Sequence, residues 1–337
     1  MVIEERYGEL QDRRLVFSDR SRVSEGLTYV PEFLVRNSNL DEIIAVINGL
    51  KPVMQLECPY KNIDSLKDAL EELKEIYGLE YRISSYKYLI NSPEDYCEVV
   101  DLDDGREGKV SYSVSYDDSI NEKSQRYYLN KSRTWERAGE FSKKFSRVMG
   151  YPECCVEFGD SLSGNKGDEE KIRKNMVWSK AHIRSFMNSD RISRLLNIFT
   201  LDSLVPHVPC HLDCEESKEY ARNMLEILEK EDRRTAELRK FFISCNSLFW
   251  FYSEFFLFVG EKKGNFITYT DFMPVSFSDS FFFGELDEGF REKFGRTEEL
   301  LESGDGVEMG RDCFRVYSGD EEIGRVEKDR PFENILF

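Results

Sequence analysis

The chain has 337 residues, and its 47 Lys and Arg against 65 Asp and Glu give a formal net charge of −18. Such an acidic surface repels phosphate, which excludes generic nucleic-acid binding as the function. Hydrophobic residues make up 40% of the chain and aromatic residues 13%, which is enough for a substantial core. The composition therefore predicts a soluble globular protein, and the length suggests about two domains.

The sequence predicts neither a secretory signal nor a membrane span. The first residues, Met1 to Arg6, are charged where a signal peptide needs an apolar stretch. The most apolar segment, Leu248 to Val259, is too short for a transmembrane helix and contains Glu254. We therefore expect a cytoplasmic protein without a membrane partner. In that reducing compartment, eight cysteines favour metal, cluster or redox chemistry over a disulfide framework.

The first part of the chain, residues 1–130, has the pattern of a small α/β domain. Apolar spacing and turn residues predict, in chain order, a helix at 39–49, a strand at 51–58, a helix at 62–77 and a strand at 79–84. This order is typical of a β-α-β unit. The Asp-Asp-Gly sequence at 103–105 predicts a tight turn that would pair strands at 96–102 and 109–116 as a hairpin. The polar residues 117–131 are expected to form a loop.

The second part, residues 131–245, is predicted to be a helical core that carries the Cys and His motifs. Helices are expected at 132–149, about 171–199 and 214 to about 244. The polar segment 160–170 is expected to be a loop between the first two helices.

The third part, residues 246–337, is expected to be a β-rich segment packed on the helical core. Strands are predicted within 247–277 with a turn at 262–265, followed by a helix at 286–303 and a hairpin at 312–326. The many aromatic residues of this part are expected in buried strands, and an exposed portion could mediate homo-oligomerisation. The three parts together predict an α+β fold.

Four of the eight cysteines fall in two short motifs. Gly-Tyr-Pro-Glu-Cys-Cys places Cys154 and Cys155 side by side, and the segment PHVPCHLDC contains His207, Cys210 and Cys214. A Cys-x-x-x-Cys pair with a histidine three residues upstream has the spacing of metal ligands. The sequence therefore predicts one site with Cys154, Cys155, His207, Cys210 and Cys214 as metal ligands, and with Cys154 and His207 as catalytic residues. The other cysteines lie among apolar neighbours and are expected to be core residues: Cys58, Cys97, Cys245 and Cys313.

Both motifs are expected to lie at helix N-termini. Gly150 is expected to end the preceding helix, and Pro152 is favoured in the first turn of the next one. Asp213 is expected to be the N-cap of the last helix of the core, with Cys214 as its first residue. Unpaired N–H groups and the helix dipole at such ends stabilise thiolates.

This constellation leaves three functions open. The leading hypothesis is a metal-dependent or iron–sulfur enzyme in which the thiolates hold an iron–sulfur cluster or zinc, the choice between them being open. Lys143, Lys144 and Arg147 lie near the first motif and could hold a small anionic substrate. The alternatives are a non-enzymatic binding module stapled by zinc and a metal-free thiol redox or sulfur-transfer enzyme, with Cys154 and Cys155 as nucleophile and resolving thiol.

At these two motifs the sequence resembles an uncharacterised prokaryotic, mainly archaeal family catalogued as domain of unknown function 483. The resemblance rests on a Gly-Tyr-Pro-x-Cys-Cys turn at 150–155 and on a His-x-Pro-Cys-x-x-x-Cys-x-x-Ser segment from His207 to Ser217. It covers roughly residues 132–245. It implies that the two segments belong together, and it implies no activity because none is assigned to the family.

Overall fold

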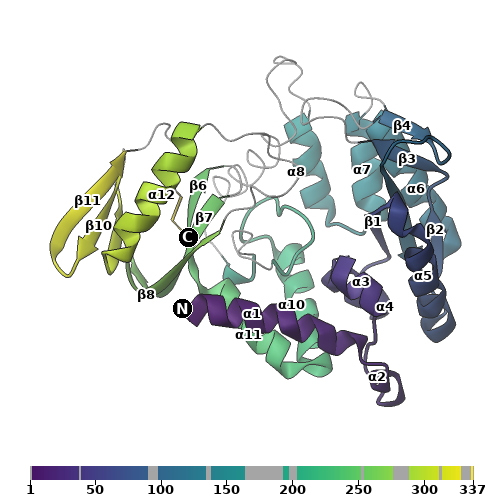
Figure 1. Cartoon of the computed structure of the whole chain (residues 1–337), viewed down its shortest axis with the longest axis horizontal. Coiled ribbons are helices and arrows are strands. Elements are labelled where there is room, and N and C mark those ends of the chain that lie inside the picture. The colour runs from purple at the N-terminus through teal and green to yellow at the C-terminus, as the bar shows by residue number, and fades with distance from the viewer. Residues whose placement is uncertain are drawn as a thin grey trace.

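Two β-sheets lie at opposite ends of the molecule, with helices between them (Figure 1). The computed structural model describes residues 2–37, 39–89, 98–133, 138–163, 193–196, 203–251, 254–275, 288–310, 313–327 and 335–336. All strand pairings among these residues are antiparallel, and the helices pack against and between the sheets. The predicted α+β class is therefore confirmed.

The first sheet is built around its strand β5. Its strands are β1 (Val53–Pro59), β2 (Glu80–Ile83), β3 (Tyr86–Leu89), β4 (Glu98–Asp101) and β5 (Lys109–Ser115). β5 pairs with β1 on one side and with β2 and the end of β3 on the other, and β4 continues the sheet beyond β3. The expected β1-helix-β2 unit is present, with β5 inserted between its two strands.

The hairpin predicted around residues 103–105 does not form. Both of its strands exist, but β4 pairs with β3 in full register and does not pair with β5. The cause is the buried side chain of Lys87 on β3, whose Nζ donates to the carbonyls of Asp104 and of Arg106, the latter at 3.0 Å. The loop is therefore folded over β3, and β3 separates the two strands that the turn sequence seemed to join.

The segment 117–131, predicted to be a loop, is largely the helix α6 (Asp118–Arg133). It packs on the first sheet through buried polar side chains. Ser124 Oγ donates to Gln55 Oε1 at 2.8 Å, and Asn121 Nδ2 donates to the carbonyl of Glu80 at 2.8 Å. The prediction failed because hydrogen-bonding residues face the sheet here, so the segment lacks an apolar helical pattern.

One set of helices lies in the N-terminal part of the chain and a second set in its middle. The N-terminal ones are α1 (Val2–Arg14), η1 (Leu15–Ser18), α2 (Ser21–Ser24), α3 (Glu32–Asn37), α4 (Leu40–Ile47), η2 (Tyr60–Asn62) and α5 (Ile63–Tyr77). The later ones are α7 (Ala138–Val148), α8 (Glu153–Ser163), η4 (Arg194–Leu196), α10 (Glu215–Glu231) and α11 (Arg233–Ser244). The helix predicted at 39–49 is thus α4, and the one predicted at 62–77 is α5, which ends at Gly78 with φ +69°.

The single helix predicted from 214 to 244 is two helices. They are broken at Asp232, whose extended backbone (φ −156°, ψ 97°) ends α10 and begins α11. The Asp232 carboxylate accepts hydrogen bonds from Thr235 and from Arg13 of α1, so the break is held by a partner far away in the sequence. Most of the helix predicted at 171–199 lies outside the described residues; within it, 194–196 form the 3₁₀ turn η4.

The second sheet has seven strands in the order β11-β10-β9-β8-β7-β6-β12. They are β6 (Asn246–Phe251), β7 (Glu254–Lys263), β8 (Phe266–Val275), β9 (Gly306–Met309), β10 (Cys313–Ser318), β11 (Glu321–Glu327) and β12 (Ile335–Leu336). The helix α12 (Glu288–Glu302) packs against it (Figure 1), with Phe294 stacked on Phe256 at 4.7 Å between ring centroids. The predicted turn at 262–265, the helix at 286–303 and the hairpin at 312–326 are all present, and buried aromatic residues form the core of this sheet.

The largest apolar core joins the parts of the chain. It draws buried side chains from Ile3 of α1, Leu70 of α5, Leu228 of α10, Phe242 of α11 and Met273 of β8. Residues from each of the three predicted parts therefore share one core. The domain boundaries at 130 and 245 stay a prediction.

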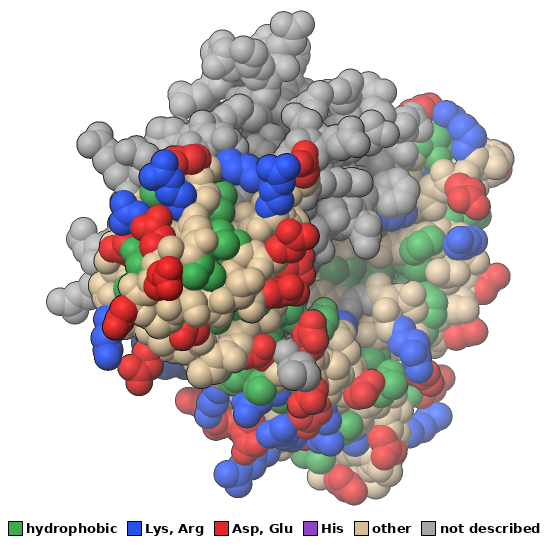
Figure 2. Space-filling model, turned by 60° about the vertical axis from the view of Figure 1, so that its left-hand side comes forward, with side chains coloured by type: hydrophobic (Ala, Val, Ile, Leu, Met, Phe, Trp, Pro, Cys, Tyr) green, Lys and Arg blue, Asp and Glu red, His purple; other side chains and the backbone are tan. Residues whose placement is uncertain are grey.

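Charged side chains of both signs are interspersed over the face of the molecule in Figure 2. On that face the net charge of −18 is not gathered into one acidic field. Among the helices that the structure describes, none has the length and apolar character needed to cross a membrane.

The polar interface between α6 and the sheet gives a stability prediction. Ser124→Ala leaves the buried Gln55 Oε1 without its donor, so we expect a loss of about 1–3 kcal/mol in the free energy of unfolding, measured by denaturant titration. Lys123→Ala, at an exposed position of the same helix, is the control and should change it by less than about 0.5 kcal/mol. Equal effects of the two changes would contradict the role given to the buried hydrogen bond.

Candidate metal centre

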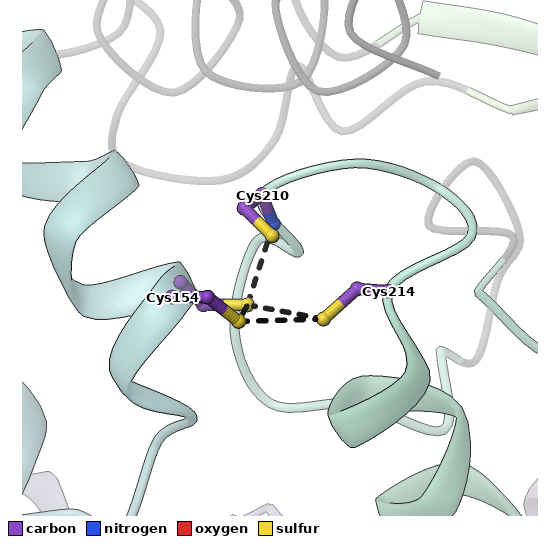
Figure 3. A group of neighbouring side chains, drawn as sticks. Cys154, Cys210 and Cys214 are labelled. Atoms are coloured by element: carbon purple, nitrogen blue, oxygen red, sulfur yellow. Dashed lines mark hydrogen bonds between the residues drawn. The ribbon is translucent and has the colours of Figure 1, made fainter. Parts of the chain in front are cut away.

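Four cysteines that are distant in the sequence meet at one point. The sulfur atoms of Cys154, Cys155, Cys210 and Cys214 all lie within 4.8 Å of one another. Cys154 Sγ lies 3.8 Å from Cys155 Sγ and 3.6 Å from Cys214 Sγ, and Cys155 Sγ lies 3.8 Å from Cys214 Sγ. In Figure 3 the labelled side chains turn their sulfurs toward one another from the start of α8, from the loop before α10 and from the start of α10. This group could hold a metal ion.

The first pair of cysteines is positioned by a tight helix end. Gly150 has φ +76° and donates its N–H to Arg147, while the N–H of Tyr151 donates to the carbonyl of Ser146, at 3.1 Å in both cases. This is a Schellman motif, with Gly150 at the predicted position after α7. A Cβ atom at Gly150 would lie 2.5 Å from Cδ of Pro52, so the turn also packs tightly against the start of β1.

After this turn the chain begins α8 at once. The carbonyl of Pro152 accepts hydrogen bonds from the N–H groups of Cys155 and Val156, both at 2.9 Å. Cys154 and Cys155 therefore stand in the first turn of the helix, as predicted, with Pro152 just before it. At this end the helix dipole favours thiolates.

The second pair lies on a loop and on the cap that follows it. Cys214 itself is the N-cap of α10, with φ −60° and ψ 116°, and its carbonyl accepts the N–H of Lys218 at 2.9 Å. The prediction that Asp213 is the N-cap was therefore wrong by one residue. The Asp213 carboxylate instead accepts a hydrogen bond from Lys218 Nζ, in the first turn of α10, at 2.7 Å.

Hydrogen bonds reach the sulfurs from the backbone and from a serine. The N–H of Cys210 donates to Cys155 Sγ at 3.3 Å, and Ser217 Oγ lies 3.4 Å from the same sulfur. Hydrogen bonds from the thiols of Cys155 and Cys210 lower the pKa of Cys214, whereas contacts with Cys210 and Cys214 raise the pKa of Cys155. Without a metal, contacts among the thiols therefore favour the thiolate form at Cys214 and the protonated form at Cys155.

His207 lies outside the four-sulfur group, although it was predicted as a fifth ligand. Its Nε2 is 2.9 Å from Ser217 Oγ, so Ser217 stands between the imidazole and the Cys155 sulfur. Its ring lies 5.1 Å from the ring of Tyr151 and packs edge-on against that of Tyr220 at 6.4 Å between centroids. The histidine therefore contacts the centre through the Ser217 hydroxyl. Its predicted catalytic role stays a prediction.

Ser217 contacts the centre, although it was not among the predicted ligands or catalytic residues. It is fully buried and contacts both Cys155 and His207. Its spacing three residues after Cys214 places both residues on one side of a helix start, and this spacing was the available signal.

Two of the three cations expected to hold an anionic substrate, Lys143 and Arg147, are paired with carboxylates. Lys143 forms ion pairs with Glu157 and with Asp160 of α8, and Arg147 pairs with Glu153 and Glu157. Among the other cysteines, those at 58, 245 and 313 are buried away from the centre, while the one at 97 lies outside the described residues.

The sulfur spacing is compatible with a bound metal ion. A metal bound tetrahedrally by four sulfurs at about 2.3 Å sets sulfur–sulfur distances of about 3.8 Å. The distances among Cys154, Cys155 and Cys214, at 3.6–3.8 Å, agree with this edge length, and the Cys210 sulfur lies within 4.8 Å of each of them. With four thiols available, all four positions of a tetrahedral ion can be filled by protein. Comparison with protein-family models, curated proteins and solved structures finds no match for this chain.

The Gly150 turn leads to a matched pair of variants. Gly150→Ala places a side chain at positive φ and against Pro52, so we expect a loss of at least about 1 kcal/mol in stability. Gly159→Ala lies in α8 with open space around it and should stabilise by about 0.5–1 kcal/mol. Denaturant titration of both variants checks this, and a neutral Gly150→Ala would rule out the close turn.

His207 leads to a prediction about pH. Desolvation lowers the pKa of His207 to about 4, from 6.5 for a free histidine. Between pH 6.5 and pH 4, His207 is therefore protonated in the unfolded chain and neutral in the folded chain. The free energy of unfolding should fall by about 3 kcal/mol as the pH drops from 6.5 to 4. The slope of unfolding free energy against pH in this window should be smaller in His207→Gln. Loss of metal in acid affects both proteins, so only identical slopes would contradict the prediction.

Proposed function

We propose that this chain binds one zinc ion through Cys154, Cys155, Cys210 and Cys214, and that the ion clamps the start of α8 to the loop and cap that begin α10. The observation that carries this proposal is the close packing of the four sulfurs, at the spacing of a tetrahedral tetrathiolate. Zinc in a closed set of four cysteines is a structural ion. Of the functions that the sequence left open, the zinc-stapled module fits best, because an ion with four protein ligands has no open position for a substrate.

A polynuclear cluster fits the spacing less well. In an iron–sulfur cluster the thiolates are divided among several irons, so some of the ligand sulfurs are held further apart than the edge of one tetrahedron. Here the four sulfurs are all within 4.8 Å of one another. A single ion bound by all four thiols satisfies this arrangement directly.

The surroundings suit a centre with excess negative charge. Zinc carries two positive charges and four thiolates carry four negative ones, so the bound centre has a net charge of −2. The N-termini of α8 and α10 both face it, and the N–H of Cys210 donates to Cys155 Sγ. These groups offset part of that charge.

A single iron ion is the second candidate, because four thiolates in a tetrahedron also bind iron. The N–H···S bond to Cys155 would then stabilise the reduced, more negative state. Zinc gives a colourless protein and iron a coloured one, so the absorption spectrum separates them. We also propose, on the two motifs alone, that the chain is related to the domain of unknown function 483 family.

Metal analysis and thermal unfolding test the proposal. We expect one zinc per chain after purification under reducing conditions, and a fall of roughly 5–10 °C in the midpoint of unfolding when zinc is removed by a chelator. Cys214→Ser should lose the metal and most of this shift.

Cys58→Ser is the matched control, because Cys58 is a buried cysteine outside the centre. It should keep one zinc per chain. A chain without metal after reconstitution, or with equal metal content in both variants, would refute the proposal.

A further inference from the structure

The four cysteines differ in their access to solvent. Cys155 and Cys214 are buried, Cys210 is half-buried and Cys154 is exposed. Cys154, in the first turn of α8, is therefore the ligand of the tetrathiolate that is most open to solvent. Small reagents in solution reach the Cys154 sulfur before they reach the others.

The sulfurs also differ in their hydrogen bonds. Cys155 accepts from the N–H of Cys210 and contacts the Ser217 hydroxyl, which draws charge away from its sulfur. Among the described residues, the contacts of the Cys154 sulfur are thiols and the carboxylate of Glu216, at 3.6 Å. When a metal holds Cys154 as a thiolate, this carboxylate donates no hydrogen bond to it, so the charge on the Cys154 sulfur stays available for attack.

We propose that Cys154 is an oxidation site of this centre: a hydroperoxide oxidises its thiolate, and Cys214 then closes a disulfide with it and releases the metal. This inference rests on the proposed function for the metal, but the order of reaction among the sulfurs follows from exposure and contacts alone.

The chemistry proceeds in two balanced steps. The Cys154 thiolate attacks one peroxide oxygen; an S–O bond forms, the O–O bond breaks, and the peroxide is reduced to an alcohol or water after taking a proton. The sulfur has lost two electrons and is a sulfenic acid. The Cys214 thiolate then attacks that sulfur; an S–S bond forms, the S–O bond breaks, and hydroxide leaves as water with a second proton. Two thiolate ligands are lost, so the ion is released.

Cys214 is favoured over Cys155 as the resolving thiol. Its sulfur is the nearer of the two to Cys154, at 3.6 Å against 3.8 Å. Neighbouring residues in a chain have Cα atoms about 3.8 Å apart, below the range of about 4.4–6.8 Å that disulfides prefer. A bond between Cys154 and Cys155 would therefore distort the first turn of α8, whereas a bond to Cys214 links two separate helix starts.

The nature of the reagent follows from the surroundings. The bound centre is anionic and the Glu216 carboxylate lies beside the open sulfur, so anionic reagents are repelled. A hydroperoxide is small and neutral. Oxidation by a peroxide produces a sulfenic acid, and a thiolate in contact with Cys154 is in place to react with it. Alkylation by an electrophile produces no sulfenic acid, so it would make no use of this neighbouring thiolate.

Peroxide titration of the zinc-loaded full chain tests the proposal. Zinc release is followed with a chromogenic chelator, and the oxidised cysteines are mapped by mass spectrometry after less than one equivalent of hydrogen peroxide. We expect the Cys154–Cys214 disulfide as the first product, with one zinc released per disulfide. A first product at Cys155–Cys210, or sulfenic acid trapped first at Cys210, would overturn the proposal.

Cys154→Ser alone is not decisive, because it removes a ligand. We therefore add labelling of the unaltered chain by substoichiometric iodoacetamide, which should modify Cys154 at least about tenfold faster than Cys155 or Cys214. Equal labelling would overturn the proposal.

The metal-free chain separates this inference from the proposed function. If the chain holds no zinc, the proposed function fails, while sulfenic acid trapped first at Cys154 in the metal-free chain still supports the oxidation site, and sulfenic acid trapped first at Cys214 overturns it. Cys58→Ser should react with peroxide at the unaltered rate, since Cys58 is buried elsewhere.

Discussion

The crowding of four thiols is the constraint on which this part of the structure depends. Sulfurs within 4.8 Å of one another cannot all be thiolates unless a cation lies between them, because like charges at that distance repel strongly. In the absence of a cation, some of the thiols keep their protons. The raised pKa of Cys155 and the lowered pKa of Cys214 reflect this, because the two thiols share hydrogen bonds. A bound divalent ion resolves the repulsion and fixes α8 against α10 in the same step.

The position of the centre depends on parts of the chain far from the cysteines. The turn at Gly150 is held against Pro52 at the start of β1, and the neighbouring Tyr151 ring carries the Lys51 ammonium over its face at 5.4 Å. Lys51 is itself buried and paired with Glu42 of α4. The first sheet therefore sets where the first cysteine pair lies, and the ion would join that sheet to the helices of the middle of the chain.

Sequence reasoning succeeded where chemistry is local and failed where it depends on a distant partner. The end of α7 at Gly150 follows from the preference of glycine itself, and the start of α8 was predicted to within one residue, at Pro152 where the helix begins at Glu153. The N-cap of α10 was misplaced by one residue, at Asp213 instead of Cys214, and the hairpin was misjudged because Lys87 holds the turn over β3. The grouping of the cysteines could be predicted from their spacing, but the place of His207 behind Ser217 could not, since side-chain direction is set by packing.

The charges around the centre bear on what it can do. Carboxylates stand at its rim, with Glu153 paired to Arg147, Glu215 paired to Lys218, and Glu216 against the Cys154 sulfur. Surface pairs of this kind contribute little to stability, so their effect here is on the local potential. If the proposed tetrathiolate of net charge −2 lies behind them, they oppose the approach of an anion, and Lys143 and Arg147, once expected to bind one, are already paired. The centre is thus better suited to hold its ion and to meet neutral reagents than to bind an anionic substrate.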